Sequence, residues 1–294
     1  MEYFMQLLIV GLATGCLYAV IAIGFVLIYK ATDVLNFAQG ELLLVGAYVF
    51  YMFNATMHLH FFISFFLTLC FCFVFGLVVE RFVLRPMIGE PPFSIVMITF
   101  GLSIMVRSIV RIIWGGTDKV FPKFFSLAPV HFLGLSLPKI YLDLVGISII
   151  FFAAIFFFMR FSKWGLAMRA TASNGTVATL MAINIKTIFG LAWAISAVVA
   201  AVGGIFFGYI NIVSPHIGVI GLNLFPAVVV GGLDSLLGAV IGGFLIGILE
   251  NLSGGYLSEF LGGGLKNIMP FVILILVLMV RPFGLFGKIE LERV

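Results

Sequence analysis

Three polar side chains, Asn36, Gln39 and Glu41, interrupt the otherwise apolar stretch "VLNFAQGELLLVGAY" at 34–48. A lipid-facing helix gains nothing from such groups, and each unpaired polar group costs it several kcal/mol. The three side chains are therefore expected to be paired inside the protein or hydrated. This segment is the first candidate for chemistry in the chain.

The spacing of Asn36 and Gln39 is that of a capping box, in which a cap residue precedes Glu or Gln by three positions before an apolar run. It predicts that these two residues begin a helix and cap its first turn. Glu41 is left over, because at 100° per residue it lies about 140° from Asn36 around that helix. Two interpretations of Glu41 stay open: an ion pair with the nearby Lys30, or the functional role that intramembrane carboxylates usually have.

Little else in the chain suggests enzymatic or metal chemistry. The three cysteines lie inside apolar runs, which indicates small buried hydrophobic residues rather than disulfides or ligands. The four histidines show no metal-ligand spacing, and no GxxxxGKS or GxxxxGKT sequence is present to cradle ATP phosphates. We predict that the chain is not an enzyme, binds no metal and carries no cofactor of its own.

Composition identifies the class of protein. The 294 residues are 63% hydrophobic and 10% charged, with a mean hydropathy of +1.27, whereas soluble domains carry about 25% charged residues. No stretch is polar enough to form a soluble domain, so residues 1–294 are expected to form a single transmembrane domain. The net charge of +4 is scattered along the chain, which argues against nucleic-acid binding.

A helix needs about 20 apolar residues to cross the hydrocarbon core of a bilayer. The sequence predicts an all-α polytopic membrane protein, a bundle of about eight transmembrane helices plus one short half-helix at 222–232. The full-length spans are 4–29, 37–54, 61–83, 93–114, 141–159, 187–213, 236–252 and 265–280. Residues 115–140 hold prolines and glycines and are expected to form turns.

Basic residues suggest the orientation, because cytoplasmic loops carry an excess of Lys and Arg. One alternating topology places ten of the sixteen basic residues on the same side: Lys30, Arg81, Arg85, Arg160, Lys163, Arg169, Lys186, Arg281, Lys288 and Arg293. Lys186 and Arg281 share a side only if an even number of crossings separates them, and three full-length spans lie between them. The short run must therefore cross as well, with the turn 231–235 in the cytoplasm. Because broken helices at membrane depth lie inside protein or beside a water-filled cavity, 222–235 is a pathway candidate.

The polar segment 160–186 is predicted to be a cytoplasmic helix. On such a helix a stripe of small side chains falls within about 120°: Ala167, Ala170, Asn174, Ala178 and Ala182. A small stripe allows another backbone to approach closely. By spacing alone, packing against the chain's own bundle is the preferred explanation of the stripe.

Glycine pairs four residues apart predict close helix packing. Gly11 and Gly15 form one such pair in the first span. Two further pairs, Gly238 with Gly242 and Gly243 with Gly247, lie on nearly opposite sides of the span 236–252. This span is therefore expected to pack on both faces.

Four segments together resemble the LivH-type permeases of branched-chain amino acid ABC importers, and the match spans nearly the whole chain. These segments are "GLATGCLYAVIAIGFVLIYKATDVLNFAQGELLLVGAY", "GLAMRATASNGTVATLMAIN", "VVVGGLDSLLGAVIGGFLIGILENL" and "RPFGLFG". The usual form of the first motif has His at the position of Gln39.

The resemblance implies roles for two sets of residues. A segment within 160–186 would be the coupling helix that docks in a groove of an ATPase, through Gly165, Ala167, Arg169, Ala170, Asn174 and Ala178. The substrate pathway would be lined by Asn36, Gln39, Glu41, Pro226, Gly231, Gly232 and Asp234.

The same resemblance implies a function and a set of partners. The chain would be a multi-pass permease subunit of the bacterial inner membrane, moving branched-chain amino acids or a related small polar solute inward. Its partners would be a second, LivM-like permease, two cytoplasmic ATPases and an external substrate-binding protein. Two alternatives are a sugar permease of the related ribose type and a secondary transporter, which would need a relay of intramembrane carboxylates or histidines.

Overall fold

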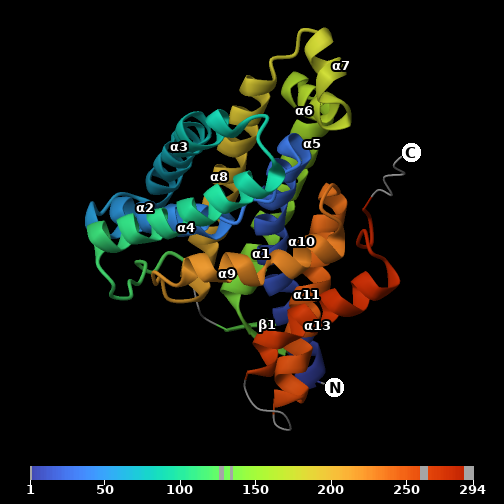
Figure 1. Ribbon diagram of the computed structural model, residues 1–294. Coiled ribbons are helices and arrows are strands. Elements are labelled where there is room, and N and C mark those ends of the chain that lie inside the picture. Colours follow the sequence, from blue (N-terminus) through green and yellow to red (C-terminus); the bar gives the residue numbers. More distant parts are fainter. Residues whose placement is uncertain (1, 126–128, 133–134, 259–263, 288–294) are drawn as a thin grey trace. The chain divides into compact units, whose positions relative to one another are not determined.

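The computed structural model describes residues 2–125, 129–132, 135–258 and 264–287 (Figure 1). Within these ranges the chain is helical apart from one small hairpin, which confirms the predicted all-α membrane class. Two compact units divide the chain: residues 1–26, 126–148 and 223–294 form the first unit, and residues 27–125 and 149–222 form the second.

Every predicted span contains a helix. Six helices are long and apolar enough to cross a membrane: α1 (Glu2–Thr32), α3 (Phe61–Val79, extended to Met87 by η2, Glu80–Leu84, and η3, Arg85–Met87), α4 (Pro92–Trp114), α5 (Lys139–Phe161), α8 (Ile185–Ile210) and α11 (Leu236–Tyr256). Two others are shorter: α2 (Gln39–Tyr51), which continues as the π-helix η1 (Met52–Thr56), and α13 (Leu265–Val280). The predicted half-helix corresponds to α10 (Phe225–Gly231), preceded by α9 (Ile217–Asn223).

The turn-rich segment contains the hairpin. Strands β1 (Pro129–Phe132) and β2 (Leu135–Pro138) pair antiparallel, with Pro129 opposite Pro138. Near it in the sequence, Lys119 forms an isolated bridge with Val213 in the second unit. The prediction of turns alone was therefore incomplete, because two four-residue strands are too short to show an alternating pattern in the sequence.

The second unit is built around α2. Twelve of the 13 residues of α2 are buried, and α3, α4 and α8 pack against it; Figure 1 shows α4 running alongside α2. Glycine permits the closest of these approaches, since a Cβ built on Gly46 would lie 2.7 Å from the Cβ of Ala201 in α8. A helix buried on all sides has no lipid-facing surface, so α2 can carry polar side chains.

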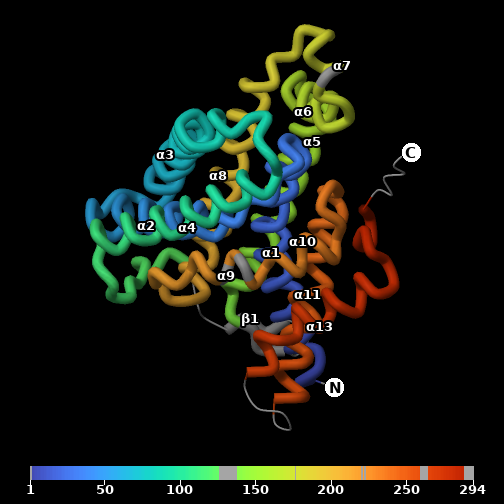
Figure 2. The backbone as a smooth tube through the Cα atoms, viewed as in Figure 1, coloured from blue at the N-terminus to red at the C-terminus, as the bar shows by residue number. Residues whose placement is uncertain are grey.

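In the first unit, α11 packs on both faces, as its glycine pairs predicted. On one face, a Cβ built on Gly243 would lie 2.6 Å from the Cα of Ala19 in α1. On the other, a Cβ on Gly242 would lie 3.0 Å from the Cα of Gly231 in α10. The helices α10, α11 and α13 pack together (Figure 2). They enclose a core of Ala227, Val230, Ile246 and Ile273.

The predicted single helix over 160–186 is wrong. The structure forms α6 (Lys163–Ser173) and α7 (Gly175–Leu180), separated by Asn174, whose backbone is extended at φ −162° and ψ 104°. The side chain of Asn174 accepts a hydrogen bond from the Val177 N–H at 3.0 Å. Asn174 thus ends one helix and caps the next, because its side chain satisfies an N–H group that the new helix cannot satisfy internally.

A serine fixes the start of α11. The Ser235 Oγ accepts a hydrogen bond from the Gly238 N–H at 3.0 Å, directly after the turn that ends α10. We expect Ser235→Ala to lower the free energy of unfolding by about 1 kcal/mol through loss of this cap. Thermal unfolding of the detergent-solubilised protein would measure the loss, with the exposed Ser173→Ala as control. Equal melting temperatures for the two variants would show that the cap contributes nothing.

Candidate functional site

The polar cluster lies where the chain enters α2. Residues 33–38, between α1 and α2, are not helical. This segment contacts α4 two turns beyond the start of that helix. The Phe37 N–H donates to the Thr99 hydroxyl at 3.3 Å, and Thr99 lies about 10 Å along the axis from the start of α4 at Pro92. Irregular backbone at membrane depth must be satisfied by protein groups, and here side chains supply them.

Asn36 stabilises this irregular segment, but not through a capping box. Its Oδ1 accepts from the Ala38 N–H at 3.0 Å, two residues ahead. Its Nδ2 donates to the Gln39 Oε1 at 3.3 Å. Helix α2 begins without a side-chain cap at Ala38. The predicted reciprocal cap is therefore wrong, because the Asn36 side chain bonds locally to hold a turn instead.

Gln39 connects this turn to α8. Its Oε1 also accepts from the Ser196 hydroxyl at 3.0 Å, and both side chains are completely buried. Among the described residues no partner is found for the Gln39 Nε2. Ser196 was missed by the sequence analysis, since a lone serine in an apolar span gives no signal of its own.

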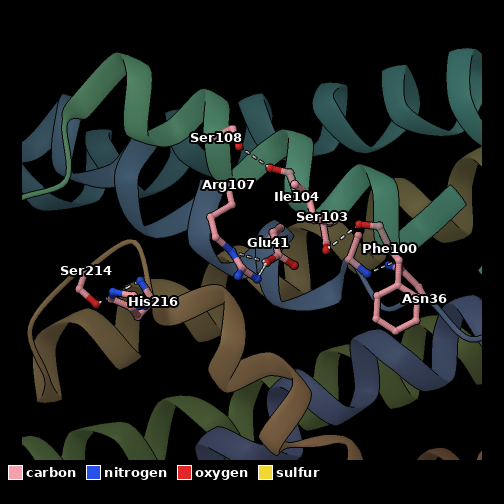
Figure 3. A network of polar contacts seen from close by, with 10 residues as sticks. Asn36, Glu41, Phe100, Ser103, Ile104, Arg107, Ser108, Ser214 and His216 are labelled. Atoms are coloured by element: carbon pink, nitrogen blue, oxygen red, sulfur yellow. Dashed lines mark hydrogen bonds and ion pairs between the residues drawn. The ribbon is translucent and has the colours of Figure 1, made fainter. Parts of the chain in front are cut away.

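Glu41 forms an ion pair with Arg107 of α4, as Figure 3 shows. The Arg107 Nε donates to the Glu41 Oε1 at 3.1 Å, and the Nη2 donates to the same oxygen. The side chain of Glu41 is 1% exposed and that of Arg107 is 24% exposed. The partner is therefore not Lys30, one of the two possibilities that the sequence left open.

Arg107 is a residue that the sequence analysis missed. It is the sole charged residue of α4 apart from Arg111 near the helix end. An ionisable residue deep in an apolar span is by default functional or paired. The position of Arg107 in the middle of an apolar run therefore indicates such a role. By charge alone it is one of the six basic residues outside the ten predicted to lie on the cytoplasmic side.

The second unit brings α9 against this ion pair. A Cβ built on Gly218 would lie 2.5 Å from the Glu41 Oε1 and 3.5 Å from the Arg107 Nη2. Only glycine leaves room there for the two side chains. The pair thus lies where α2, α4 and α9 meet.

The other predicted pathway residues lie in the first unit, around the end of α10. Pro226 occupies the first turn of α10, where its missing N–H group costs nothing. Gly231 and Gly232 end the helix, and Gly232 has φ +106°, a conformation that favours glycine. The final motif "RPFGLFG" completes this end, because the N–H groups of Leu285 and Phe286 donate to the Val230 and Gly231 carbonyls at 2.9 and 3.1 Å. The turn to α11 follows, with Asp234 half-buried.

The predicted coupling residues lie on α6 and α7 in different environments. Gly165 and Ala178 are buried, Ala167, Arg169 and Ala170 are half-buried, and Asn174 is exposed. The guanidinium of Arg169 donates to the Arg160 carbonyl at 3.4 Å. Besides Lys163, five large apolar side chains are exposed here: Trp164, Leu166, Val177, Leu180 and Met181. Gly165 and Ala178 therefore lie toward the chain itself, whereas these large apolar residues face outward.

One cavity of about 250 Å³ opens in the second unit, near the η2 and η3 helices. Glu80 lines it and is held by Arg85 through two hydrogen bonds of 3.2 and 2.8 Å. Trp193 and Phe189 of α8 form an aromatic wall. Within the described part of the chain, no group of His, Cys, Asp and Glu could hold a metal ion.

Multiple apolar spans, a helix with twelve of its 13 residues buried and a buried ion pair within one span define a multi-pass membrane protein. The chain belongs to the family described as "Branched-chain amino acid transport system / permease component", which matches residues 7–278. This finding confirms the family indicated by the four sequence segments.

Individual relatives agree with this family. The chain is 33% identical to "High-affinity branched-chain amino acid transport system permease protein LivH" of Escherichia coli (strain K12), over 99% of this chain and 98% of that protein. It is 29% identical to BraD of Pseudomonas aeruginosa, described as a permease protein of the same kind of system, over the same shares. Among solved structures, "PsaBC from Streptococcus pneumoniae in complex with Fab" has a TM-score of 0.52 at 14% identity, covering 97% of this chain and 94% of that one. This last likeness concerns the fold alone.

Proposed function

We propose that this chain is the transmembrane permease subunit of an ABC importer that moves branched-chain amino acids inward. The observation that carries the proposal is the family match over 7–278, supported by 33% identity to a LivH protein along nearly the whole chain. The permease itself performs no chemistry; ATP is hydrolysed by separate subunits. Coupling then consists of stabilising inward-open and outward-open states differently.

The arrangement of ionisable groups favours this proposal over a secondary transporter. A proton-coupled transporter needs a relay of intramembrane carboxylates or histidines. Three buried glutamates of this chain each have a basic partner instead: Glu41 has Arg107, Glu80 has Arg85, and Glu250 has Lys266 at 3.8 Å. Separate ion pairs do not form a relay.

The proposal also includes partners and a location. They are a second, LivM-like permease, two cytoplasmic ATPases and an external substrate-binding protein, assembled in the bacterial inner membrane. The names of the relatives support a permease component, and the exposed apolar side chains of α6 and α7 support a docked partner. The substrate pathway is proposed to include the start of α2 and the turn that follows α10.

The test is uptake by the complete transporter in proteoliposomes loaded with ATP. Radiolabelled leucine, isoleucine or valine should accumulate only when the binding protein and ATP are both present. Ribose serves as the control for the sugar-permease alternative. Accumulation of ribose but not of leucine would show that the transporter carries sugars rather than branched-chain amino acids.

The topology gives a separate prediction. Single cysteines at Lys163 and Ser235, in a background lacking the three native cysteines, should react with impermeant maleimide only from the cytoplasmic face. A cysteine at Lys119 should react only from outside, because α4 lies between it and the cytoplasmic side. Labelling in right-side-out and inside-out vesicles measures this. Reaction at position 235 from outside alone would contradict a crossing by α9 and α10.

A further inference from the structure

We propose that Arg107 binds the carboxylate of the transported amino acid on the exposed face of α4, and that Glu41 positions its guanidinium for this purpose. The inference rests on the proposed function, because it names the group that recognises the proposed substrate. It adds a binding residue, Arg107, and a positioning residue, Glu41.

The depth of Arg107 is the first argument. It lies seven residues before Trp114, or about 10 Å along the axis of α4 from that end. Its guanidinium cannot extend toward the membrane surface, because its Nε and Nη2 are both bonded to the buried Glu41. Yet 24% of the side chain is exposed. A cation held at this depth is not stable against lipid, so its exposed part faces water or protein in the assembled transporter.

The hydrogen bonds of Arg107 are the second argument. A guanidinium has five N–H donors, and the ion pair uses only two of them, both toward the Glu41 Oε1. No further hydrogen bond of Arg107 is found among the residues described. The remaining donors are available for a carboxylate, and a guanidinium is well suited to bind one through two parallel hydrogen bonds.

The surroundings of Arg107 on α4 are the third argument. At 100° per residue, Met97, Gly101, Ile104 and Ser108 fall within about 60° of one another, and all four are exposed. A Cβ on Gly101 would meet no atom within 4 Å. Arg107 lies at the edge of this stripe, as its partial exposure shows. This stripe is apolar apart from Ser108, whose hydroxyl bonds the Ile104 carbonyl, and with one guanidinium at its edge it is complementary to a branched alkyl side chain attached to a carboxylate.

The first experiment compares Arg107→Lys with Arg111→Lys in the complete reconstituted transporter. Arg111 is the matched control, because it lies on the same helix but within one turn of its end, where a long side chain reaches the membrane surface. For Arg107→Lys, leucine taken up per ATP hydrolysed should fall about tenfold or more, the effect of losing a charge-assisted hydrogen bond. Stimulation of ATP hydrolysis by the binding protein should persist. Uptake equal to that of Arg111→Lys would overturn the proposal.

A purely structural ion pair is distinguished by exchanging the two charges. Glu41→Arg combined with Arg107→Glu keeps an ion pair but removes the exposed guanidinium. The exchange should leave leucine uptake per ATP as low as in Arg107→Lys. Recovery to the wild-type ratio would show that the pair only holds α2 against α4.

The second experiment does not disturb the ion pair. Ser108→Cys, in a variant lacking the native cysteines, should react with a water-soluble methanethiosulfonate reagent, and leucine delivered by the binding protein should slow that reaction. Phe66→Cys, exposed on the apolar helix α3, is the lipid-facing control and should not react. A Ser108→Cys that is unreactive, or that leucine does not protect, overturns the proposal. If wild-type protein fails to take up leucine, the proposed function fails instead, while the reactivity of Ser108→Cys still reports whether this face is wetted.

Discussion

Replacing Glu41 by alanine is expected to lower the free energy of unfolding by about 3–5 kcal/mol. The loss arises because the Nε and Nη2 of Arg107, which both bond the Glu41 carboxylate, would be left without an acceptor on the buried side of the pair, where the Glu41 side chain is 1% exposed. Removing one member of a buried pair costs far more than the pair itself contributes. Thermal unfolding of the purified permease in detergent measures the effect.

Two further variants separate this effect from simple loss of packing. Glu41→Leu combined with Arg107→Leu removes both charges and should recover most of the lost stability, since an apolar pair of similar volume is often neutral in place of a buried ion pair. Glu90→Ala, at an exposed carboxylate, should leave the melting temperature unchanged. A Glu41→Ala protein as stable as Glu90→Ala would show that the two Arg107 donors facing Glu41 need no acceptor there and that the ion pair does not stabilise the fold.

The sequence was sufficient to predict helices but not the pairing of polar groups between them. Each span follows from a run of apolar residues long enough to cross the bilayer, and each has its helix. The partner of Glu41 is 66 positions away in α4, and the partner of Gln39 is 157 positions away in α8. Such contacts depend on how helices are placed in space, which local spacing does not determine.

Close helix packing was predictable where small residues repeat every four positions. Gly238, Gly242, Gly243 and Gly247 occupy the two faces of α11 that their spacing indicated, because glycine alone allows backbones so near each other. The prediction for 160–186 was wrong because it assumed one unbroken helix. Asn174 followed by Gly175 is a local signal that one helix ends and a new, capped helix begins.

That break changes which residues can dock against a partner. Ala178 is only 3% exposed, whereas Asn174 and Ala182 are exposed, so the stripe does not form one continuous surface. Leu180 and Met181 are 81% and 73% exposed, in a segment predicted to lie in the cytoplasm rather than in lipid. Exposed apolar side chains on an aqueous surface indicate a binding partner, and the proposed ATPase subunits would lie on this side.

Leu180→Asp and Met181→Asp are therefore each expected to abolish co-purification of the ATPase subunits and leucine uptake. Burying a leucine side chain stabilises a contact by about 1.5–3 kcal/mol, and an aspartate in its place must also be stripped of water. An affinity lowered by about 3 kcal/mol falls more than a hundredfold. The permease itself should unfold at an unchanged temperature, because neither side chain contributes to its core.

The contrasting variant is Ala178→Trp, at a buried position of the same helix. Overpacking there should destabilise the isolated permease by about 1–3 kcal/mol, so its melting temperature should fall while that of Leu180→Asp does not. Thr179 is exposed and lies between Ala178 and Leu180. Thr179→Asp controls for the added charge and should retain most ATPase binding. If Leu180→Asp and Met181→Asp co-purify with the ATPases as well as Thr179→Asp does, the docking surface lies elsewhere on the cytoplasmic side, and the exposed side chains of α7 do not take part in coupling.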